Sequence, residues 1–290
     1  MSKIAILTDS SCDIPQEMAE KYGIDIMSFH ILLDDVDYVE RESCTNTEFY
    51  NKMRLAKGVP STAAITPIQF CEKYCQYVDE GYTDVIHVPI NKSGSSTYNN
   101  ALMAQGMLRE ERPEHHMKIH LLDPHTYSMV FGWYLCEMAR KLKNGAEISH
   151  VIQEFEKQMN CMEIILGPYS LKQMKKSGRI SAAAAVMGEL MGVRPIITLI
   201  DGKTKVESKV RGDDKVVPAM IELCKKRADG VENFDYMIGH TNIKQAEDLE
   251  KACRKAFGKA PLVVFELGGV VSANTGPDTV ALVYTGHSRG

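Results

Sequence analysis

Three loops rich in hydroxyl side chains are the places where this chain could bind a ligand. Each follows a strand pattern and precedes a helical pattern: Thr8-Asp9-Ser10-Ser11, residues 60–67 (PSTAAITP) and residues 93–98 (SGSSTY). Hydroxyl groups and the free amides of helix N-termini donate hydrogen bonds without adding charge, so such loops suit a carboxylate or a phosphate. The alternative is that these serines and threonines only cap the helices that follow.

Two arginines form a second candidate feature, because each follows a turn pattern. Arg179 lies in the stretch SGRI (177–180), and Arg211 lies in the stretch KVRG (209–212). A guanidinium bonds an anion through two N–H groups, so two such arginines could frame the mouth of a site. Taken alone, the two arginines could equally form ion pairs on the exposed surface. A Gly-Pro turn at residues 274–278 (NTGPD) needs no function of its own.

The common catalytic and nucleotide-binding motifs are absent from the sequence. It contains no G-x-x-x-x-G-K-[ST], G-x-G-x-x-G, G-x-S-x-G or H-E-x-x-H pattern. His115 and His116 are adjacent on a polar loop and should point in different directions, so we expect no metal site there. Asp9 and Asp123, each at the end of a strand pattern, are the acidic candidates for catalysis. The alternative for both residues is that they cap a helix or order a loop.

Composition limits the possible partners and compartments. The chain has 290 residues, with 34 Lys and Arg against 38 Asp and Glu, and its formal net charge of -4 argues against a broad basic surface for nucleic acid. Its apolar runs are too short for a membrane-spanning helix, and MSKIAILTDS enters a strand pattern without a signal peptide. We therefore expect a cytoplasmic protein. Its eight cysteines include no C-x-x-C pair, which indicates reduced core thiols.

The first half of the chain alternates strand and helix patterns. Thr45 with Glu48, and Thr66 with Gln69, have the spacing of capping boxes and predict the starts of two helices. This alternation is typical of a parallel sheet with helices on both faces. The expected strands are residues 3–7, 83–90 and 118–122, and the expected helices are one beginning at Pro15 and those at 46–56, 67–80, 97–109 and 126–142.

Past Asn160 the pattern becomes partly antiparallel. Residues 195–200, the turn Asp201-Gly202 and residues 203–210 should form a hairpin, because Asp-Gly favours a type I′ turn. We therefore predict two domains, residues 1–160 and residues 161–290, with a mixed sheet and helices on one face in the second. The other expected elements are a strand at 161–166, helices at 181–191, 213–228 and 243–257, and a strand-rich end comprising LVVFELGG, VVSAN and TVALVYTG.

Taken in order, these motifs resemble the DegV family of bacterial fatty-acid-binding proteins. The combination of GRIS with RPI-x-x-x-x-DG is specific, and the resemblance covers nearly the whole chain. The matching stretches are TDSSCDIP after the first strand, the loops at 60–67 and 93–98, Asp123, LKQMKKSGRIS (171–181), MGVRPIITLIDGK (191–203), KVRG (209–212) and the terminal Gly-Pro turn.

The resemblance implies an α/β fold with two domains and a ligand cleft between them. A three-layer α/β/α domain with a parallel sheet would face a two-layer α/β domain with a mixed sheet, and a long-chain fatty acid would be buried between the two. The protein would be a carrier without catalytic activity, metal or cofactor. It would present the fatty acid carboxylate to a partner kinase, which forms an acyl-phosphate for phospholipid synthesis.

The site residues of the family carry over by position in three groups. The residues expected at the fatty acid carboxylate are Thr62, Ser95, Ser93, Ser96 and Asn274. The residues expected at the site mouth or partner surface are Arg179 and Arg211. The residues expected to support the site from the first loop are Asp9, Ser10 and Ser11.

The sequence departs from the family pattern near the expected head group. Ala63-Ala64-Ile65 stands where that pattern has Ser-Gln-Pro, Asn274 stands where it has His, and Asp278 stands where it has Gly. Asparagine can bond a carboxylate but cannot exchange a proton as histidine does, so lipid binding should survive this change more easily than kinase coupling. Lys92 stands where small serines are common, and it could face either the ligand carboxylate or solvent.

Two other functions stay open at this point. The first is a lipid-binding protein that is uncoupled from any kinase. The second is a small-molecule phosphotransferase related to the dihydroxyacetone kinase substrate domain, which shares the broad architecture. The lack of a nucleotide-binding loop and of paired catalytic carboxylates counts against this second function.

Overall fold

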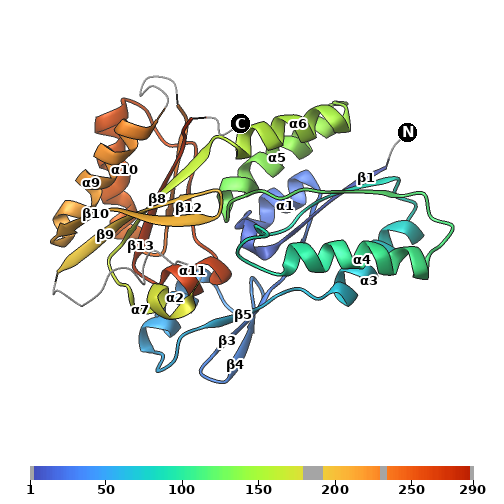
Figure 1. Ribbon diagram of the computed structural model, residues 1–290, viewed down its shortest axis with the longest axis horizontal. Helices are drawn as coiled ribbons and strands as arrows, with labels where there is room; N and C mark the ends of the chain where they lie inside the picture. The colour runs from blue at the N-terminus through green and yellow to red at the C-terminus, as the bar shows by residue number, and fades with distance from the viewer. Residues whose placement is uncertain (1–2, 179–191, 229–233, 288–290) are drawn as a thin grey trace.

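The first part of the chain forms a parallel sheet of four strands (Figure 1). The computed structural model describes residues 3–178, 192–228 and 234–287. Successive residues of β1 (Ile4–Asp9), one of the two inner strands, alternate between two apolar clusters. Ala5 and Leu7 face one helical layer, and Ile6 faces the other. The sheet is therefore buried on both faces, as its nearly continuous apolar strands predict. In sheet order the strands are β2 (Ile24–Met27), β1 (Ile4–Asp9), β6 (Asp84–Val88) and β7 (Lys118–Leu121).

Helices cover both faces of this sheet and confirm the expected three layers. Figure 1 shows α3 and α4 on the opposite side of β1 from α5 and α6. The two predicted capping boxes form: Glu48 N donates to Thr45 Oγ1 and Gln69 N donates to Thr66 Oγ1, each at 3.3 Å. The helices are α1 (Gln16–Tyr22), α2 (Asn46–Leu55), α3 (Pro67–Asp79), α4 (Thr97–Glu111), α5 (Met129–Lys143) and α6 (Ile148–Met159).

The second large sheet is mixed and is formed by the later part of the chain. Its predicted hairpin turn is confirmed, because Asp201 and Gly202 have φ angles of 51° and 71°, as a type I′ turn requires. The helices α9 (Val216–Arg227), which follows η2 (Asp213–Lys215), and α10 (Ile243–Phe257) cover one face. In sheet order its described strands are β10 (Lys203–Arg211), β9 (Val193–Ile200), β8 (Met162–Pro168), β13 (Thr279–Thr285), β11 (Tyr236–His240) and β12 (Val264–Glu266).

A small antiparallel sheet, which the sequence patterns do not predict, carries one of the candidate site residues. Its strands, in sheet order, are β4 (Val36–Val39), β3 (His30–Leu33) and β5 (Ser61–Ala63). Asp34 and Asp35 make the turn between β3 and β4 with positive φ angles of 47° and 63°, so this hairpin lacks the glycine that usually marks such a turn. Thr62 pairs with Ile31 in this sheet, which fixes its position.

One prediction near the C-terminus is wrong. The segment VVSAN is not a strand, because residues 269–275 form the helix α11 (Gly269–Thr275). Val270 and Val271 are β-branched and favour strands, but the buried carboxylate of Glu40 accepts a hydrogen bond from Val270 N at 2.8 Å. That bond satisfies an amide at the helix start from a distant part of the chain, so no local pattern could reveal the helix.

Other differences concern element boundaries. The helix expected from residue 126 begins at Met129, because Ser128 has a φ angle of 65° and cannot continue a helix. Pro15 is the N-cap of α1 and not its first helical residue. The strands β2 and β11 and the helix α6 are additional to the expected elements, as is the short helix α7 (Lys172–Ser177). The helix expected at 181–191 lies outside the described residues.

A single apolar cluster joins the two large sheets. It contains Ile86 of the parallel sheet, Phe131 and Leu135 of α5, and Ile164 and Leu199 of the mixed sheet. The face of the mixed sheet that α9 and α10 leave uncovered therefore turns toward α5 and the parallel sheet. This arrangement encloses the space in which the candidate site lies.

Candidate functional site

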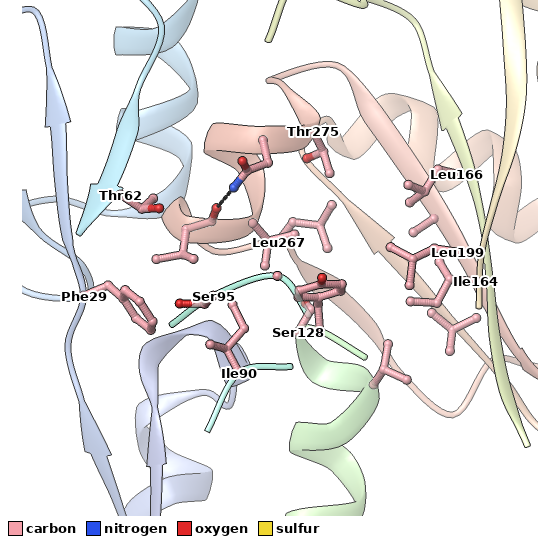
Figure 2. Close-up of a pocket in the computed structure, with 18 of the residues that line it drawn as sticks. Phe29, Thr62, Ile90, Ser95, Ser128, Ile164, Leu166, Leu199, Leu267 and Thr275 are labelled. Carbon is pink, nitrogen blue, oxygen red and sulfur yellow. Dashed lines mark hydrogen bonds between the residues drawn. The ribbon is translucent and has the colours of Figure 1, made fainter. Parts of the chain in front are cut away.

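A pocket lies between the inner face of the mixed sheet and the loops that follow the parallel strands (Figure 2). From the first part of the chain, Phe29, Ile90 with residues 94–96, and residues 127, 128 and 130 follow the carboxyl ends of β2, β6 and β7, where ligands of parallel α/β sheets usually bind. Thr62 and Ala64 come instead from β5 and the residue after it. Among the described residues that line it, none is an aspartate, glutamate, lysine or arginine. The apolar part of the lining includes Ile164, Leu166, Leu199, Phe265, Leu267, Val271, Ala281 and Val283.

Hydroxyl groups gather at one end of this pocket. Figure 2 shows Thr62 and Ser95, with Phe29 and Ile90 beside them, at the opposite end from Leu166 and Leu199, so neutral hydroxyls are present at one end and the other end is apolar. Thr62 comes from β5, whereas Ser95 comes from the loop between β6 and α4. In the described part of the chain, Thr62 Oγ1 has no hydrogen-bond partner, and the buried Thr275 Oγ1 of α11 has none either.

Asn274 and Ser96 complete the polar end. Asn274 lies on α11, and its Nδ2 donates a hydrogen bond to the carbonyl oxygen of Val270 at 2.8 Å. An amide nitrogen carries two hydrogens, so one N–H group of Asn274 stays available to a ligand. The structure therefore brings together Thr62, Ser95, Ser96 and Asn274 of the carboxylate residues expected from the sequence.

Asp9 fixes the loop that carries Ser95. Its Oδ2 atom accepts a hydrogen bond from Ile90 N at 2.7 Å, and its Oδ1 atom accepts one from Ser11 Oγ at 2.5 Å. Complete burial raises the pKa of Asp9 to about 7, because the charged form is poorly solvated there. Asp9 and Ser11 are thus tied to each other, and neither is among the described residues that line the pocket.

Two further buried acids, which the sequence patterns did not single out, hold the start of α11. Glu40 accepts hydrogen bonds from Ser10 Oγ and Val270 N, and Asp13 accepts one from Ser128 Oγ. Burial raises the pKa of both carboxyl groups, and the neighbouring Glu40 raises that of Asp13 further. Glu40 and Asp13 are brought together only by the fold, so no local spacing could indicate this cluster.

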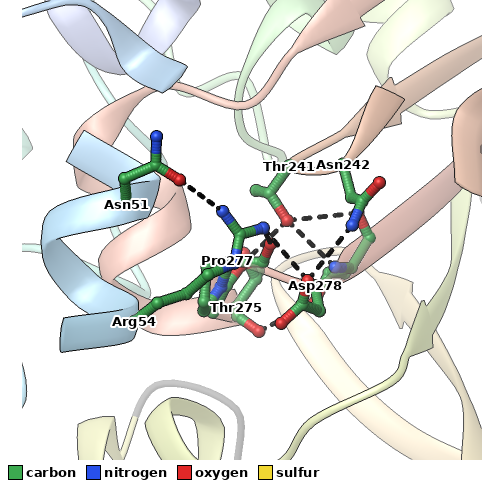
Figure 3. A network of polar contacts seen from close by, with 9 residues as sticks. Asn51, Arg54, Thr241, Asn242, Thr275, Pro277 and Asp278 are labelled. Atoms are coloured by element: carbon green, nitrogen blue, oxygen red, sulfur yellow. Dashed lines mark hydrogen bonds and ion pairs between the residues drawn. The ribbon is translucent and has the colours of Figure 1, made fainter. Parts of the chain in front are cut away.

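The Gly-Pro turn after α11 is also held by a residue from the first half of the chain (Figure 3). Arg54 of α2 donates to the carbonyl oxygen of Pro277 at 2.6 Å and to Asp278 Oδ1 at 3.0 Å. Asn242 Nδ2 donates to the same Asp278 oxygen at 3.2 Å. Asp278 therefore has a structural role and links α2 to the turn.

The remaining candidate residues lie away from the pocket lining or outside the description. Ser93 Oγ donates to Asn91 Oδ1 at 3.0 Å and is not among the described lining residues. Arg211 is exposed at the last position of β10, and Arg179 lies outside the described residues. Lys92 Nζ lies 3.3 Å from Asp123 Oδ2, so it has an acidic partner of its own.

The described residues form neither a metal-binding cluster nor a membrane-spanning helix. Across residues 3–178, 192–228 and 234–287, no group of three or more His, Cys, Asp or Glu side chains is arranged to hold a metal ion. In the same ranges, no helix is long and apolar enough to span a membrane. The eight cysteines are free thiols, as predicted from their spacing.

The geometry defines the kind of ligand that this pocket suits. A long apolar wall favours a hydrocarbon, and neutral donors at one end favour a small polar group with acceptor oxygens. No lysine or arginine of the described lining would neutralise that group. An amphiphile with a long apolar body and one compact polar head therefore matches the pocket.

Comparisons with known proteins agree with this description. Residues 3–286 match the model of the DegV family, which is described as a family of uncharacterised proteins. The chain therefore belongs to the DegV family. A DegV domain-containing protein of Clostridium perfringens is 28% identical to it over 293 residues, which cover 98% of this chain and 99% of that relative.

Solved structures of the same family share the fold. A fatty-acid-binding DegV family protein from Streptococcus agalactiae is 26% identical, with a TM-score of 0.85 and coverage of 99% of this chain and 100% of that one. A DegV family protein from Thermus thermophilus, also described as binding fatty acid, has a TM-score of 0.85 at 23% identity and covers 98% of this chain and 100% of its own. The predicted α/β fold with one parallel and one mixed sheet is thus confirmed.

Proposed function

We propose that this protein binds a long-chain fatty acid in the pocket, with the carboxylate at Thr62, Ser95 and Asn274. The observation that carries the proposal is an apolar pocket without charged lining residues that ends in neutral hydroxyl and amide groups from three separate segments. The fatty-acid-binding relative from Streptococcus agalactiae, which has the same fold, supports this choice of ligand.

The size and polarity of the pocket are compatible with such a ligand. About 180 Å³ is open to the centres of water-sized groups. Because one such group needs about 10 to 15 Å³, this volume corresponds to on the order of a dozen such groups. Burying about fourteen methylenes at about 0.8 kcal/mol each contributes about 11 kcal/mol before the costs of association, which suffices for tight binding.

We propose further that the bound carboxylate is presented to a partner kinase in the cytoplasm. Hydroxyl donors orient a carboxylate without pairing it with a fixed cation, so its oxygen stays nucleophilic toward a phosphoryl donor. The carboxylate oxygen would attack the terminal phosphorus of the kinase's nucleoside triphosphate, and the bond to the nucleoside diphosphate would break. The carrier itself supplies no catalytic group in this scheme.

Arg211 is our candidate for contact with the kinase, because it is exposed on the edge strand β10 and away from the pocket. We expect Arg211→Ala to leave fatty acid binding unchanged and to slow phosphorylation of the bound lipid by the cognate kinase subunit. Equal rates for the variant and the unchanged protein would remove Arg211 from the partner surface.

A second candidate function keeps the lipid and lacks the kinase. It is favoured by Asn274, since an amide cannot take up or release a proton near the carboxylate as the family's histidine can. The two candidates are distinguished by incubating the lipid-loaded protein with cognate kinase and nucleoside triphosphate. Formation of acyl-phosphate supports the carrier of a kinase, and unchanged fatty acid supports the uncoupled lipid-binding protein.

A further inference from the structure

A second cavity adjoins the polar end of the fatty acid pocket. It lies where the loop before β5 meets the end of α7. Thr62 and Asn274 line both cavities, so the groups proposed to hold the carboxylate face the second cavity as well. The described residues that line the second cavity are Val59, Pro60, Ser61, Thr62, Lys176, Ser177 and Asn274.

The second cavity differs from the first in charge. Lys176 lines it from α7, and no acidic side chain of the described residues forms an ion pair with Lys176. Ser61, beside Thr62 on β5, also lines this space. A cation that has no acidic partner among the described residues, next to serine side chains, suits an anion with several oxygens and more than one negative charge.

We propose that this second cavity holds the phosphoryl group of the acyl-phosphate while the acyl chain remains in the first pocket. The inference rests on the proposed function. When the carboxylate oxygen forms its bond to phosphorus and the nucleoside diphosphate leaves, the new phosphoryl group must lie just beyond the carboxylate. Thr62 and Asn274 mark that position, and the space beyond them is the cavity lined by Lys176.

Lys176 therefore distinguishes the product from the substrate. The carboxylate of the fatty acid lies in the first pocket, where the described lining residues carry no charge. The phosphoryl group adds negative charge and reaches toward the Lys176 ammonium group. We expect Lys176 to contribute to retention of the phosphorylated lipid and to contribute little to the binding of the fatty acid.

The test compares two ligands with the same chain length, hexadecanoate and the stable analogue hexadecyl phosphate. We expect Lys176→Gln to weaken hexadecyl phosphate binding about five- to tenfold at low salt, and to change hexadecanoate binding less than about twofold. Lys175→Gln is the matched control, because Lys175 lies on the same helix but is not among the described residues that line the cavity. It should leave both affinities unchanged.

The possible results separate this inference from the proposed function. Weaker binding of hexadecyl phosphate alone in Lys176→Gln supports the phosphoryl site. An unchanged affinity for hexadecyl phosphate, or an equal loss with both ligands, overturns it, as does an unchanged protein that binds hexadecanoate but not hexadecyl phosphate. If the unchanged protein binds neither ligand, the proposed fatty acid function fails together with the inference.

Discussion

At the scale of single residues, Thr62 is the side chain with the clearest role in the proposed site. Its hydroxyl lines the pocket without a hydrogen-bond partner among the described residues, and β5 holds its backbone in place. We expect Thr62→Val to weaken fatty acid binding about tenfold, because one hydrogen bond to a charged carboxylate is lost while the β-branched shape is kept. Isothermal titration with hexadecanoate measures the change.

The neighbouring Ser61→Ala provides the control for that measurement. Ser61 lies on the same strand but does not line the fatty acid pocket, so its replacement should leave hexadecanoate affinity unchanged. Equal affinities for Thr62→Val and the unchanged protein would show that the carboxylate binds elsewhere.

The buried Asp9 leads to a prediction about pH. Its pKa is raised from 3.8 to about 7 in the folded protein, so the folded state keeps a proton that the unfolded chain has already released. The free energy of unfolding that Asp9 contributes is therefore fully present below about pH 4 and is lost as the pH rises toward 7. We expect the unchanged protein to lose about 2 kcal/mol more than Asp9→Asn between pH 5 and pH 7.

Denaturant unfolding of both proteins at the two pH values measures this difference. Asp9→Asn should be less stable than the unchanged protein at pH 5, because an amide offers a single acceptor oxygen to Ser11 and Ile90. The prediction fails if the two proteins show the same dependence of the free energy of unfolding on pH.

At the scale of elements, α11 depends on contacts with the first half of the chain. A side chain at Gly268, the residue before α11, would collide with Asp13 Oδ1 and lie 2.8 Å from Glu40 Oε1. We expect Gly268→Ala to lower the free energy of unfolding by about 1 to 3 kcal/mol and to weaken fatty acid binding, since α11 carries Asn274. Thermal unfolding and hexadecanoate titration measure the two effects.

Gly106→Ala is the matched control for this substitution. Gly106 lies inside α4, and an added methyl group there meets no atom within 4 Å. Because alanine favours helix over glycine, this variant should be as stable as the unchanged protein or more stable by up to about 1 kcal/mol. Similar stability of the two alanine variants would show that the acids do not constrain the start of α11.

Local patterns predicted some elements well and others poorly, for physical reasons. The capping boxes at Thr45 and Thr66 and the Asp201-Gly202 turn are short-range interactions, and each forms as predicted. The helix α11 and the strand β5 depend on partners far along the chain, namely Glu40 for α11 and β3 for β5. Short-range spacing carries no information about such partners.

At the scale of the whole molecule, the site exists only because distant segments meet. Thr62, Ser95 and Asn274 come from separate parts of the chain, and Arg54 links α2 to the turn after α11. The order of the motifs along the chain, and not any one motif, is what allowed these residues to be expected together. The charge of the adjoining cavity at Lys176 was not predicted, because α7 approaches β5 only in the fold.

We retain the division at Asn160 as a proposal for the domains. The strands of the parallel sheet precede this residue and the described strands of the mixed sheet follow it, which supports the division. The apolar cluster that contains Phe131 and Ile164 crosses it, so the two parts should unfold together. The pocket between them is the feature that the proposed function requires.

Mass spectrometry is the most direct test of this function: the protein is purified from a bacterial host, its native mass is recorded, and its organic extract is analysed. We expect one fatty acid of C14 to C18 per chain, or stoichiometric uptake of hexadecanoate by protein that is purified empty. An extract without lipid, together with no uptake of added hexadecanoate, would contradict it and would mean that the family fold here serves a different ligand.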